Sequence, residues 1–395
     1  MDVDLLPRKD FLMLSSLVRN AHGSAIRKMF NATVGQSDLI NFSVGEPDFI
    51  TPREIIDIAC TELKAGKTHY TPNRGILSLR EEISKFHAKE FPCDPAENII
   101  ITAGGTEALQ LAIFSLVDPG DEVIIFGPSW PNYLGQIQMA GAICRMIPTY
   151  EENDFHPDIG DIRAAINTRT KLLIINSPCN PTGAVLSKET LRQIADIILE
   201  YNLYAIVDEV YRNIIYGNIE FVSMYSFNDV RDRLVFVNSF SKMFAMTGWR
   251  VGYAISNASV INGMTLLHES GVSCLSEPYQ LAAEYALQNS LHRCSAMRDE
   301  YRERRDIAHA MLNQIDGISC VMPKGAFYFF VNISKFGLSS EEFCMKLLES
   351  QRVVTVPGSG FGACGEGYFR MIFAASMDKL HCGIERISTF VKEIS

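Results

Sequence analysis

The sequence predicts an α/β fold, in which a three-layer α/β/α domain with a mainly parallel sheet is followed by a smaller α+β domain. Short runs rich in Ile, Val and Leu alternate with amphipathic stretches, which is typical of strands that alternate with helices. The strand-like runs are almost continuously apolar, as expected for a sheet covered on both faces. With 395 residues, the chain is also too long for one ordinary core.

Seven segments of the first domain are predicted as strand, helix, strand, strand, helix, strand and strand. In order they are ENIIITAGG, TEALQLAIFSLV, DEVIIFGPSW, RTKLLIINSP, KETLRQIADIILEYN, LYAIVDEVY and RLVFVNSFS. Polar residues, Gly and Pro follow the strand ends. Ligands of such folds bind beyond the carboxyl ends of the strands, so these loops are the expected position of a functional site.

The pattern changes after about residue 285. RDEYRERRDIAHAMLNQ is predicted as a charged amphipathic helix and PKGAFYFFVNIS as a strand that follows a turn. EEFCMKLLESQRVVTVPGSGFG continues as helix and strand, and GYFRMIFAAS as another strand. We therefore expect an N-terminal segment over residues 1–44 that packs with the small domain, a large domain over 45–285 and the small domain over 286–395.

The composition narrows the class of protein. A formal net charge of −10 disfavours a nucleic-acid partner but allows a small anionic ligand at a local cation. The start, MDVDLLPRKDFLMLSS, is not typical of a signal peptide, and no apolar run is long enough to span a bilayer. The ten cysteines are scattered, without a CxxC pair or a Cys/His cluster. We expect no disulfide framework, no metal site, no membrane partner and a cytoplasmic location.

Two loops after predicted strands contain groups that suit a ligand. In TAGGTEAL a strand ends in Gly104 and Gly105 before a helix that starts near Thr106. The backbone N–H groups there either bind a phosphate or belong to an ordinary strand-to-helix turn. In SPCNPTG the following proline holds Asn180 extended, and its amide either donates to a ligand oxygen or forms part of a plain turn.

Two further strand ends carry charged side chains. Asp208, in AIVDEVY, ends a strand of otherwise buried-type residues, so its charge needs a partner unless it only caps a helix. Lys242, in SFSKMFAMTGWR, follows Ser239 and Ser241 and precedes Arg250 by eight positions. Hydroxyls and a guanidinium are natural ligands of a dianion, and a lysine near them is able to form a Schiff base. A solvated loop lysine is the alternative.

The order of these motifs resembles that of one enzyme family. The series consists of GGT, then Trp130 of GPSWPNY, Asn180, Asp208, Tyr211, SFSK, Arg250 and finally Arg370 of GYFRMIFAAS. From about residue 24 to residue 376 the chain is similar to the pyridoxal-phosphate-dependent aminotransferases of fold type I, class I/II, the family of the aspartate and aromatic aminotransferases.

The resemblance implies a bound pyridoxal 5′-phosphate and a role for each matching residue. Lys242 would bond covalently to the cofactor aldehyde, and Asp208 would pair with the pyridinium nitrogen. Asn180 and Tyr211 would hydrogen-bond the phenolic oxygen, and Trp130 would stack on the ring. The phosphate would be held by Gly104, Gly105, Thr106, Ser239, Ser241 and Arg250, and by Tyr70 of KTHYTPNRG reaching across a homodimer interface.

The resemblance also implies the substrate contacts and the reaction. Arg370 would bind the α-carboxylate of the substrate as a planar fork. Gly45 of SVGEPDF would lie where an N-terminal segment closes over the substrate. Lys242 would act as the base that moves a proton. The remaining substrate contacts would be Trp130 and Asn180, and the remaining catalytic residues Asp208 and Tyr211. An amino group would pass from an L-amino acid to a 2-oxo acid by a ping-pong mechanism.

The substrate and the exact reaction stay open at this point. Some bacterial dicarboxylate-specific relatives have a lysine at the position of Thr106, and Arg74 is either a ligand for a side-chain carboxylate or an interface arginine. Aromatic and aliphatic donors remain open, and glutamate with 2-oxoglutarate is the expected second pair. A lyase, cyclase or oxidase that uses the same cofactor is the alternative. A sensor fused to a DNA-binding head would need a winged-helix segment, and a nicotinamide-dependent reductase would need GxGxxG, which TAGGTEA does not match.

Overall fold

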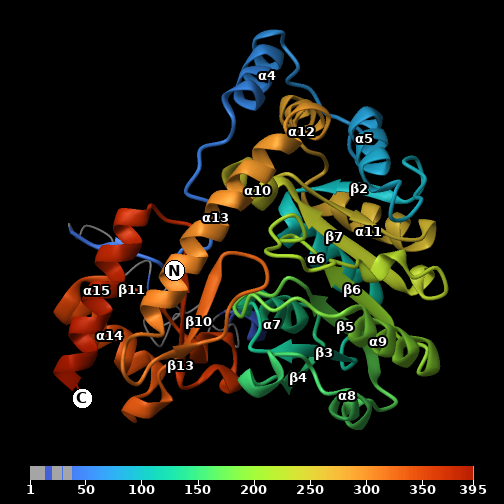
Figure 1. Ribbon diagram of the computed structural model, residues 1–395. Helices are drawn as coiled ribbons and strands as arrows, with labels where there is room; N and C mark the ends of the chain where they lie inside the picture. Colours follow the sequence, from blue (N-terminus) through green and yellow to red (C-terminus); the bar gives the residue numbers. More distant parts are fainter. Residues whose placement is uncertain (1–13, 20–28, 30–37, 395) are drawn as a thin grey trace.

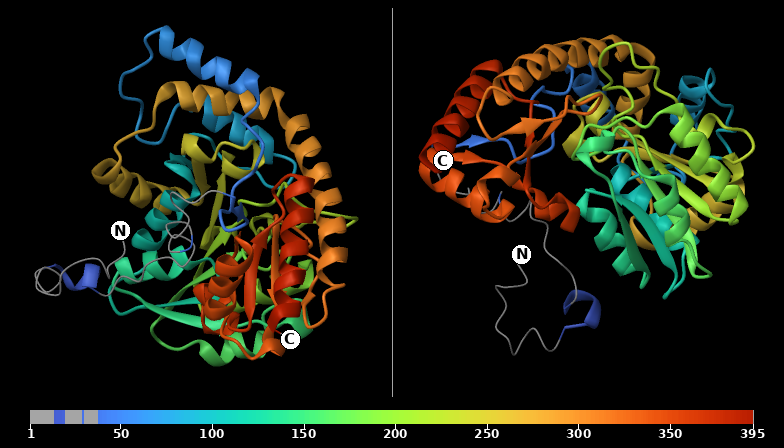
Figure 2. Two further views of the ribbon diagram at one scale, coloured as in Figure 1. Left: turned by 90° about the vertical axis from the view of Figure 1, so that its left-hand side faces the viewer. Right: turned by 60° about the horizontal axis from the view of Figure 1, so that its bottom comes forward.

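The computed structural model describes residues 14–19, 29 and 38–394, which form a large and a small region joined by a long helix (Figure 1). This helix, α13 (Leu291–Leu312), runs along the small region and reaches toward the large one (Figure 2). Within the described residues, no helix is both long and apolar enough to cross a membrane. The predicted N-terminal segment over residues 1–44 lies largely outside the described residues, and the predicted domain boundaries stay predictions.

The large region is built on a seven-stranded sheet. Its strands are β2 (Ile99–Thr102), β3 (Glu122–Gly127), β4 (Ile143–Pro148), β5 (Thr170–Asn176), β6 (Tyr204–Asp208), β7 (Leu234–Ser239) and β8 (Gly252–Ile255). They lie in the order β2-β8-β7-β6-β5-β3-β4. β8 pairs antiparallel with both of its neighbours, β2 and β7, and the other strand pairs are parallel, so the predicted mainly parallel sheet is confirmed. β4 and β8 were not among the predicted strands.

Helices cover both faces of this sheet, which explains the continuous apolar runs. In β5, Leu172 and Ile174 join the core on one face, whereas Leu173 and Ile175 join the core on the other. The first face packs against α6 (Gly104–Leu116), α7 (Pro131–Met139) and α11 (Ala258–Gly271). The second packs against α5 (Leu77–His87), α8 (Ile159–Ala165), α9 (Lys188–Glu200) and α12 (Glu277–Asn289), with α4 (Arg53–Lys64) beside α12. The predicted three-layer arrangement is confirmed.

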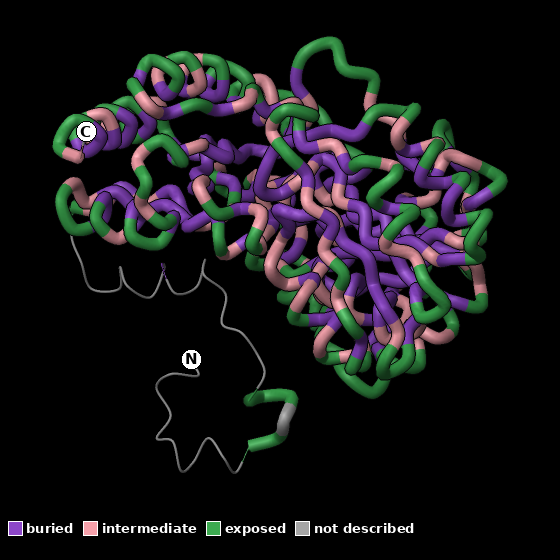
Figure 3. Tube along the Cα trace, turned by 90° about the horizontal axis from the view of Figure 1, so that it is seen from below, coloured by how far each residue is buried: buried purple, intermediate pink, exposed green. Residues whose placement is uncertain are grey.

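The small region combines an antiparallel sheet with helices. The sheet has the order β12 (Val356–Pro357), β13 (Tyr368–Ile372), β10 (Tyr328–Asn332) and β9 (Ser319–Cys320). It packs with α13, α14 (Ser340–Gln351) and α15 (Met377–Ile394). Near the N-terminus, β1 (Ile40–Asn41) pairs with β11 (Val353–Val354), so this short stretch belongs to the small region. Buried residues run through the interior of both regions (Figure 3). The predicted α+β character of this region is confirmed.

The remaining elements are short. They are α2 (Ser16–Arg19), α10 (Phe240–Met243), η2 (Glu151–Asn153), η3 (Met224–Ser226), η4 (Arg231–Arg233), η5 (Thr247–Trp249), η6 (Ser334–Phe336), η7 (Gly358–Phe361) and η8 (Ala363–Gly365).

The carboxyl ends of the central parallel strands meet at one edge of the large sheet. Asn176 at the end of β5 lies opposite Asp208 at the end of β6, and Ser239 ends the next strand, β7. Beside them, Gly252 of β8 touches the start of α6 so closely that a Cβ there would lie 2.5 Å from the carbonyl carbon of Gly104 and from the nitrogen of Gly105. The start of α6 can therefore lie this close to β8 only because residue 252 is a glycine.

We expect Gly252→Ala to destabilise the fold by about 1–3 kcal/mol, because the added methyl group overpacks a backbone contact that has no flexible side chain to move. Denaturant unfolding with a constant m-value measures this loss. Gly263→Ala is the matched control: its Cβ would meet its nearest neighbour, Ser115 Oγ, at 3.6 Å, and alanine favours the helix at that position. Equal stability of the two variants would contradict the prediction.

Candidate active site

A cavity of about 240 Å³ lies at the carboxyl edge of the large sheet, where the small region meets it. The predicted site residues that line it are Gly45, Gly105, Thr106, Trp130, Asn180, Asp208, Tyr211, Ser239, Ser241, Lys242, Arg250 and Arg370. These residues come from strand ends and loops that are far apart in the sequence. The polar groups that the sequence predicts to gather beyond the strand ends therefore line one shared cavity.

Lys242 projects into the cavity from α10, which begins directly after β7. Its Nζ donates a hydrogen bond to the carbonyl oxygen of Gly45 at 2.5 Å. Removal of water from the amine lowers the pKa of Lys242 to about 8, and the positive charges of Arg370 and Arg250 act in the same direction, against the charge of Glu46. A lysine amine in this environment loses its proton near neutral pH, which makes it a nucleophile and a base.

Asp208 brings a carboxylate to the cavity from the end of β6, where its side chain is only 2% exposed. Oδ2 accepts a hydrogen bond from the hydroxyl of Tyr133 at 2.6 Å, and Oδ1 accepts one from the backbone N–H of Val210 at 3.2 Å. Burial raises the pKa of Asp208 to about 6, although both hydrogen bonds and the charge of Lys242 oppose the rise. The ionised carboxylate is therefore suited to a positively charged partner that enters the cavity.

A cluster of hydrogen-bond donors that suits an anion forms one end of the cavity, the candidate anion-binding end. Ser239 Oγ donates to Ser241 Oγ at 2.8 Å, and the backbone N–H of Ser241 donates to Ser239 Oγ at 3.1 Å. The guanidinium of Arg250 donates to the carbonyl oxygens of Thr247 at 3.0 Å and of Ala103 at 3.3 Å. Ala103 precedes α6, whose N-terminus has no side-chain cap. Hydroxyls, a guanidinium and helix N–H groups together suit a phosphate.

The small region supplies a second cation. Arg370 of β13 is 1% exposed, and its guanidinium donates to Asn180 Oδ1 at 3.1 Å and to the carbonyl oxygen of Ser43. Its carbon lies 4.7 Å from the ring centroid of Tyr328 and 5.0 Å from that of Phe361. No described residue lies within hydrogen-bond distance of its buried Nε. A guanidinium held in this way, with donor capacity to spare, is suited to a carboxylate.

Comparison with known proteins identifies the family. The model of the family described as aminotransferase class I and II matches residues 37–387. The chain belongs to this family. Aspartate aminotransferase of Pyrococcus horikoshii is 43% identical over 367 residues, which are 92% of this chain and 93% of that protein. Aromatic-amino-acid aminotransferase 2 of Thermococcus litoralis is 37% identical over 386 residues, 97% of this chain and 99% of that protein.

The architecture gives the same result. The structure of aspartate aminotransferase from Thermus thermophilus with maleate superposes with a TM-score of 0.90 at 34% sequence identity, covering 95% of this chain and 99% of that one. The protein is therefore an aminotransferase with the fold of type I, as the resemblance of the motifs predicted.

Three predicted site residues of this aminotransferase do not line the cavity. Gly104 lies one residue before the lining of the cavity and packs against the guanidinium of Arg250. Tyr70 is 92% exposed on the surface. Arg74 donates to the carbonyl oxygen of Ala96 at 2.7 Å and also to Asn262 Oδ1, so its guanidinium is engaged within its own chain. The structure gives no support to Arg74 as a substrate ligand.

Sequence reasoning missed several residues that line the cavity. They are Leu109, Tyr133, Asn176, Val210, Thr247 and Tyr328. Asn176 is the last residue of β5, so the strand-end rule that found Asp208 could have found it too. Tyr133 lies one helical turn after Trp130, and their rings meet edge-on at 5.4 Å. Tyr328 gives no such signal, because it belongs to an aromatic run that reads as core.

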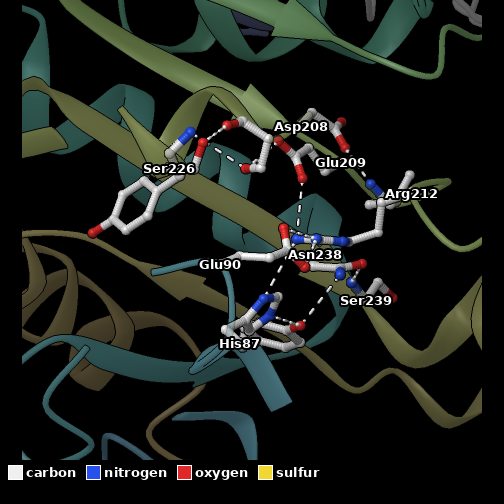
Figure 4. Close-up of polar contacts among 12 residues, drawn as sticks. His87, Glu90, Asp208, Glu209, Arg212, Ser226, Asn238 and Ser239 are labelled. Carbon is white, nitrogen blue, oxygen red and sulfur yellow. Dashed lines mark hydrogen bonds and ion pairs between the residues drawn. The ribbon is translucent and has the colours of Figure 1, made fainter. Parts of the chain in front are cut away.

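A network of ion pairs and hydrogen bonds adjoins the end of β6, next to Asp208 (Figure 4). Arg212 binds Glu209 at 3.2 Å and both carboxylate oxygens of Glu90 at 2.5 Å. Glu209 also accepts a hydrogen bond from Ser223 at 2.7 Å. Burial raises the pKa of Glu209 to about 7, against the charge of Arg212. Because Glu209 follows Asp208 directly, this network anchors the backbone that carries the cavity's carboxylate.

The network continues to the anion-binding end. Arg212 Nη1 lies 3.4 Å from Nδ1 of His87, whose Nε2 lies 2.8 Å from the hydroxyl of Tyr253. A guanidinium only donates, so Nδ1 accepts and Nε2–H donates to Tyr253. Burial and the charge of Arg212 lower the pKa of His87, which keeps the ring neutral. Asn238 donates to the Tyr253 hydroxyl at 3.2 Å and accepts from the backbone N–H of Ser239 at 2.7 Å. Both ends of the cavity thus share one buried support.

We expect the amine of Lys242 to become reactive as the pH rises through about 8, because its proton is lost there. An ordinary lysine loses its proton near about 10.4. Labelling the cofactor-free protein with an amine-reactive reagent over a range of pH, followed by peptide mass spectrometry, measures the midpoint. Lys188, which is exposed at the start of α9, is the internal reference in the same digest. A Lys242 profile that coincides with that of Lys188 would contradict the assignment.

Proposed function

We propose that this aminotransferase binds pyridoxal 5′-phosphate in the cavity and, as a homodimer in the cytoplasm, transfers an amino group between an L-amino acid and a 2-oxo acid. The observation that carries the proposal is the position of the Lys242 amine. It lies in one cavity together with the buried carboxylate of Asp208, the donor cluster that includes Arg250, and the buried guanidinium of Arg370.

The residues of the cavity fit the three chemical parts of this cofactor. Ser239, Ser241, Arg250 and the start of α6 fit the phosphate, since they offer donors at a helix N-terminus. The buried carboxylate of Asp208 fits a protonated ring nitrogen, because it has no cation in hydrogen-bond contact among the described residues. The phosphate-binding role is also supported by Gly105 and Thr106 at the start of α6, both of which line the cavity.

The other cofactor contacts follow from the remaining polar groups. The hydroxyl of Tyr211 and the amide of Asn180 suit the phenolic oxygen, and Trp130 suits a flat ring face. Pyridoxal phosphate, when bound, withdraws electrons from the α-carbon of an amino acid and so makes its proton acidic.

The chain supplies the proton transfer and the orientation of the substrate. Arg370 holds the α-carboxylate as a bidentate fork, which fixes the α-carbon relative to Lys242. Lys242 Nζ, whose pKa is lowered to about 8, takes the proton from the α-carbon and returns it on the other side of the transferred nitrogen. The carbonyl oxygen of Gly45 accepts a hydrogen bond from this amine and keeps it inside the cavity. Asp208 stays ionised beside the positive charge that it faces.

The substrate side chain meets few charges in the described part of the cavity. The cationic side chains that line it are Lys242, Arg250 and Arg370, and the proposal assigns all three. A side-chain carboxylate would therefore need a cation from outside this described lining. The relatives named above include both aspartate and aromatic aminotransferases, so both substrate classes belong in the first assays.

A homodimer is supported by the exposure of the side chain that the resemblance assigns to a subunit interface. Tyr70 is 92% exposed, so its hydroxyl is available to a second subunit. We place the Tyr70 hydroxyl at the phosphate of the neighbouring subunit, in line with the prediction from the motif. A cytoplasmic location is supported by the cysteines, all ten of which are free thiols.

We expect sodium borohydride to fix the bound cofactor to the peptide that contains Lys242, and to no peptide of Lys242→Ala, because hydride converts a C=N double bond between the lysine nitrogen and the cofactor into a stable C–N single bond. The unreduced protein should change its absorption band when an amino donor is added and recover it when a 2-oxo acid follows. A panel with aspartate, glutamate, alanine, phenylalanine and tyrosine identifies the donor. Release of ammonia, or release of more than one equivalent of an oxo acid per subunit without a second substrate, would instead indicate a lyase, cyclase or oxidase.

We expect an equal mixture of inactive Lys242→Ala and weakly active Tyr70→Ala subunits to regain about a quarter of the wild-type activity after dissociation and reassociation. Each hybrid dimer then contains one site with both Lys242 and the partner's tyrosine intact. Each variant reassociated with itself is the control. No gain of activity in the mixture, with dimers present by sedimentation, would refute the shared site.

A further inference from the structure

Tyr328 is a cavity residue that the proposed function does not use. It begins β10 in the small region and is buried beside the cavity. Its hydroxyl lies 2.5 Å from the hydroxyl of Tyr211, and its ring lies under the guanidinium of Arg370 at 4.7 Å. A Cβ at Gly45 would overlap this hydroxyl. One side chain therefore contacts three groups to which the proposed function gives separate tasks.

The two hydroxyls leave one proton without a partner. Each phenol has a single proton, and one hydrogen bond between them uses only one of the two. Neither hydroxyl has another hydrogen-bond partner among the described residues. Burial raises the pKa of both Tyr211 and Tyr328, so both protons are present at neutral pH. A buried O–H without an acceptor is unfavourable, so the spare proton calls for an acceptor oxygen in the cavity.

The contact with Arg370 fixes where the Tyr328 ring can lie. The guanidinium is itself held by Asn180 and by the carbonyl oxygen of Ser43, and Phe361 lies 5.0 Å from its carbon. On the opposite strand β13, Ile372 is the register partner of Tyr328. A ring confined by a stacked cation and a strand neighbour has little freedom to turn. Its hydroxyl is therefore held at Tyr211.

We propose that Tyr328 is a positioning residue that donates its proton to the Tyr211 oxygen, so that the proton of Tyr211 is directed at the ring oxygen of the cofactor. Through its ring, the same side chain links this hydrogen bond to Arg370 and hence to the substrate carboxylate. The inference rests on the proposed function, because it requires a cofactor oxygen as the acceptor.

The test separates the hydroxyl from the ring. Tyr328→Phe removes only the hydroxyl, and the pH at which the bound chromophore loses its proton should rise by about 0.5–1 unit, the shift expected when one hydrogen bond to a developing negative charge is weakened. The KM for the amino acid should change less than about twofold, because the ring still covers Arg370. Tyr328→Leu removes the ring as well. Its KM for the amino acid should rise about tenfold, and the pH midpoint of the chromophore titration should shift as far as in Tyr328→Phe.

Tyr216→Phe is the matched control for stability. Tyr216 is also buried and donates to the carbonyl oxygen of Ala326 at 2.5 Å, but it does not line the cavity. Removal of the Tyr216 hydroxyl should lower the melting temperature and leave unchanged the pH at which the bound chromophore loses its proton. A midpoint shift in Tyr216→Phe as large as that in Tyr328→Phe would show a general structural effect and overturn the inference.

A double-mutant cycle tests whether Tyr328 acts through Tyr211. Tyr211→Phe should shift the midpoint more than Tyr328→Phe does, and the double variant should shift it no further than Tyr211→Phe alone. Additive shifts would mean that Tyr328 acts independently, which would overturn the proposal. If the wild-type protein binds no chromophore, the proposed function itself fails. If the wild type titrates normally and Tyr328→Phe titrates identically, only this inference fails.

Discussion

A negative charge buried at the end of a parallel strand constrains the rest of the cavity. Asp208 receives hydrogen bonds from Tyr133 and from the backbone of Val210, which are neutral donors. Two such donors do not replace the water that an exposed carboxylate keeps, and the raised pKa of the group reflects the remaining deficit. A cationic ligand removes that deficit. The fold therefore holds an incompletely solvated carboxylate at the cavity, where a cationic ligand can contact it.

The surrounding elements keep this arrangement rigid. At the end of β6, the network around Arg212 ties the residue after Asp208 to Glu90 of the loop that follows α5 and, through His87, to the strand that ends in Ser239. The small region contributes Arg370 through its hydrogen bond to Asn180. The buried charges of Arg212 and Glu209 hold this geometry, because breaking their contact leaves an uncompensated buried charge. The preorganised cavity follows from these two supports.

Sequence reasoning located the site where chemistry coincides with the ends of apolar strands. Asp208, Ser239 and Lys242 were visible because a charged or hydroxyl residue interrupts a buried-type run. It failed where the deciding contact is tertiary. Tyr328 looks like one more core aromatic until β10 is seen to begin at the cavity. Arg74 looks close to a site until its guanidinium is seen to donate to Asn262 and to the carbonyl oxygen of Ala96.

The same limit applies to the missed strands of the sheet. β4 lies at the edge of the sheet, where only Ile147 of its residues is buried, and Arg145 interrupts its apolar run. β8 has only four residues, Gly252–Ile255, and runs against the parallel pattern from which the strand series was inferred.

The charge of the molecule and the charge of its cavity have opposite signs. The chain has a formal net charge of −10, whereas the basic side chains of Lys242, Arg250 and Arg370 gather in the cavity. At low ionic strength the net negative charge of the whole molecule repels an approaching anion over a long distance. At 0.1 M salt the Debye length is about 10 Å, so charges farther away than this are largely screened. Added salt therefore weakens this long-range repulsion more than it weakens the short-range attraction between the anion and the cations of the cavity. Binding of an anionic metabolite thus depends on a long-range repulsion and a short-range attraction, and moderate ionic strength favours binding because it screens the repulsion more.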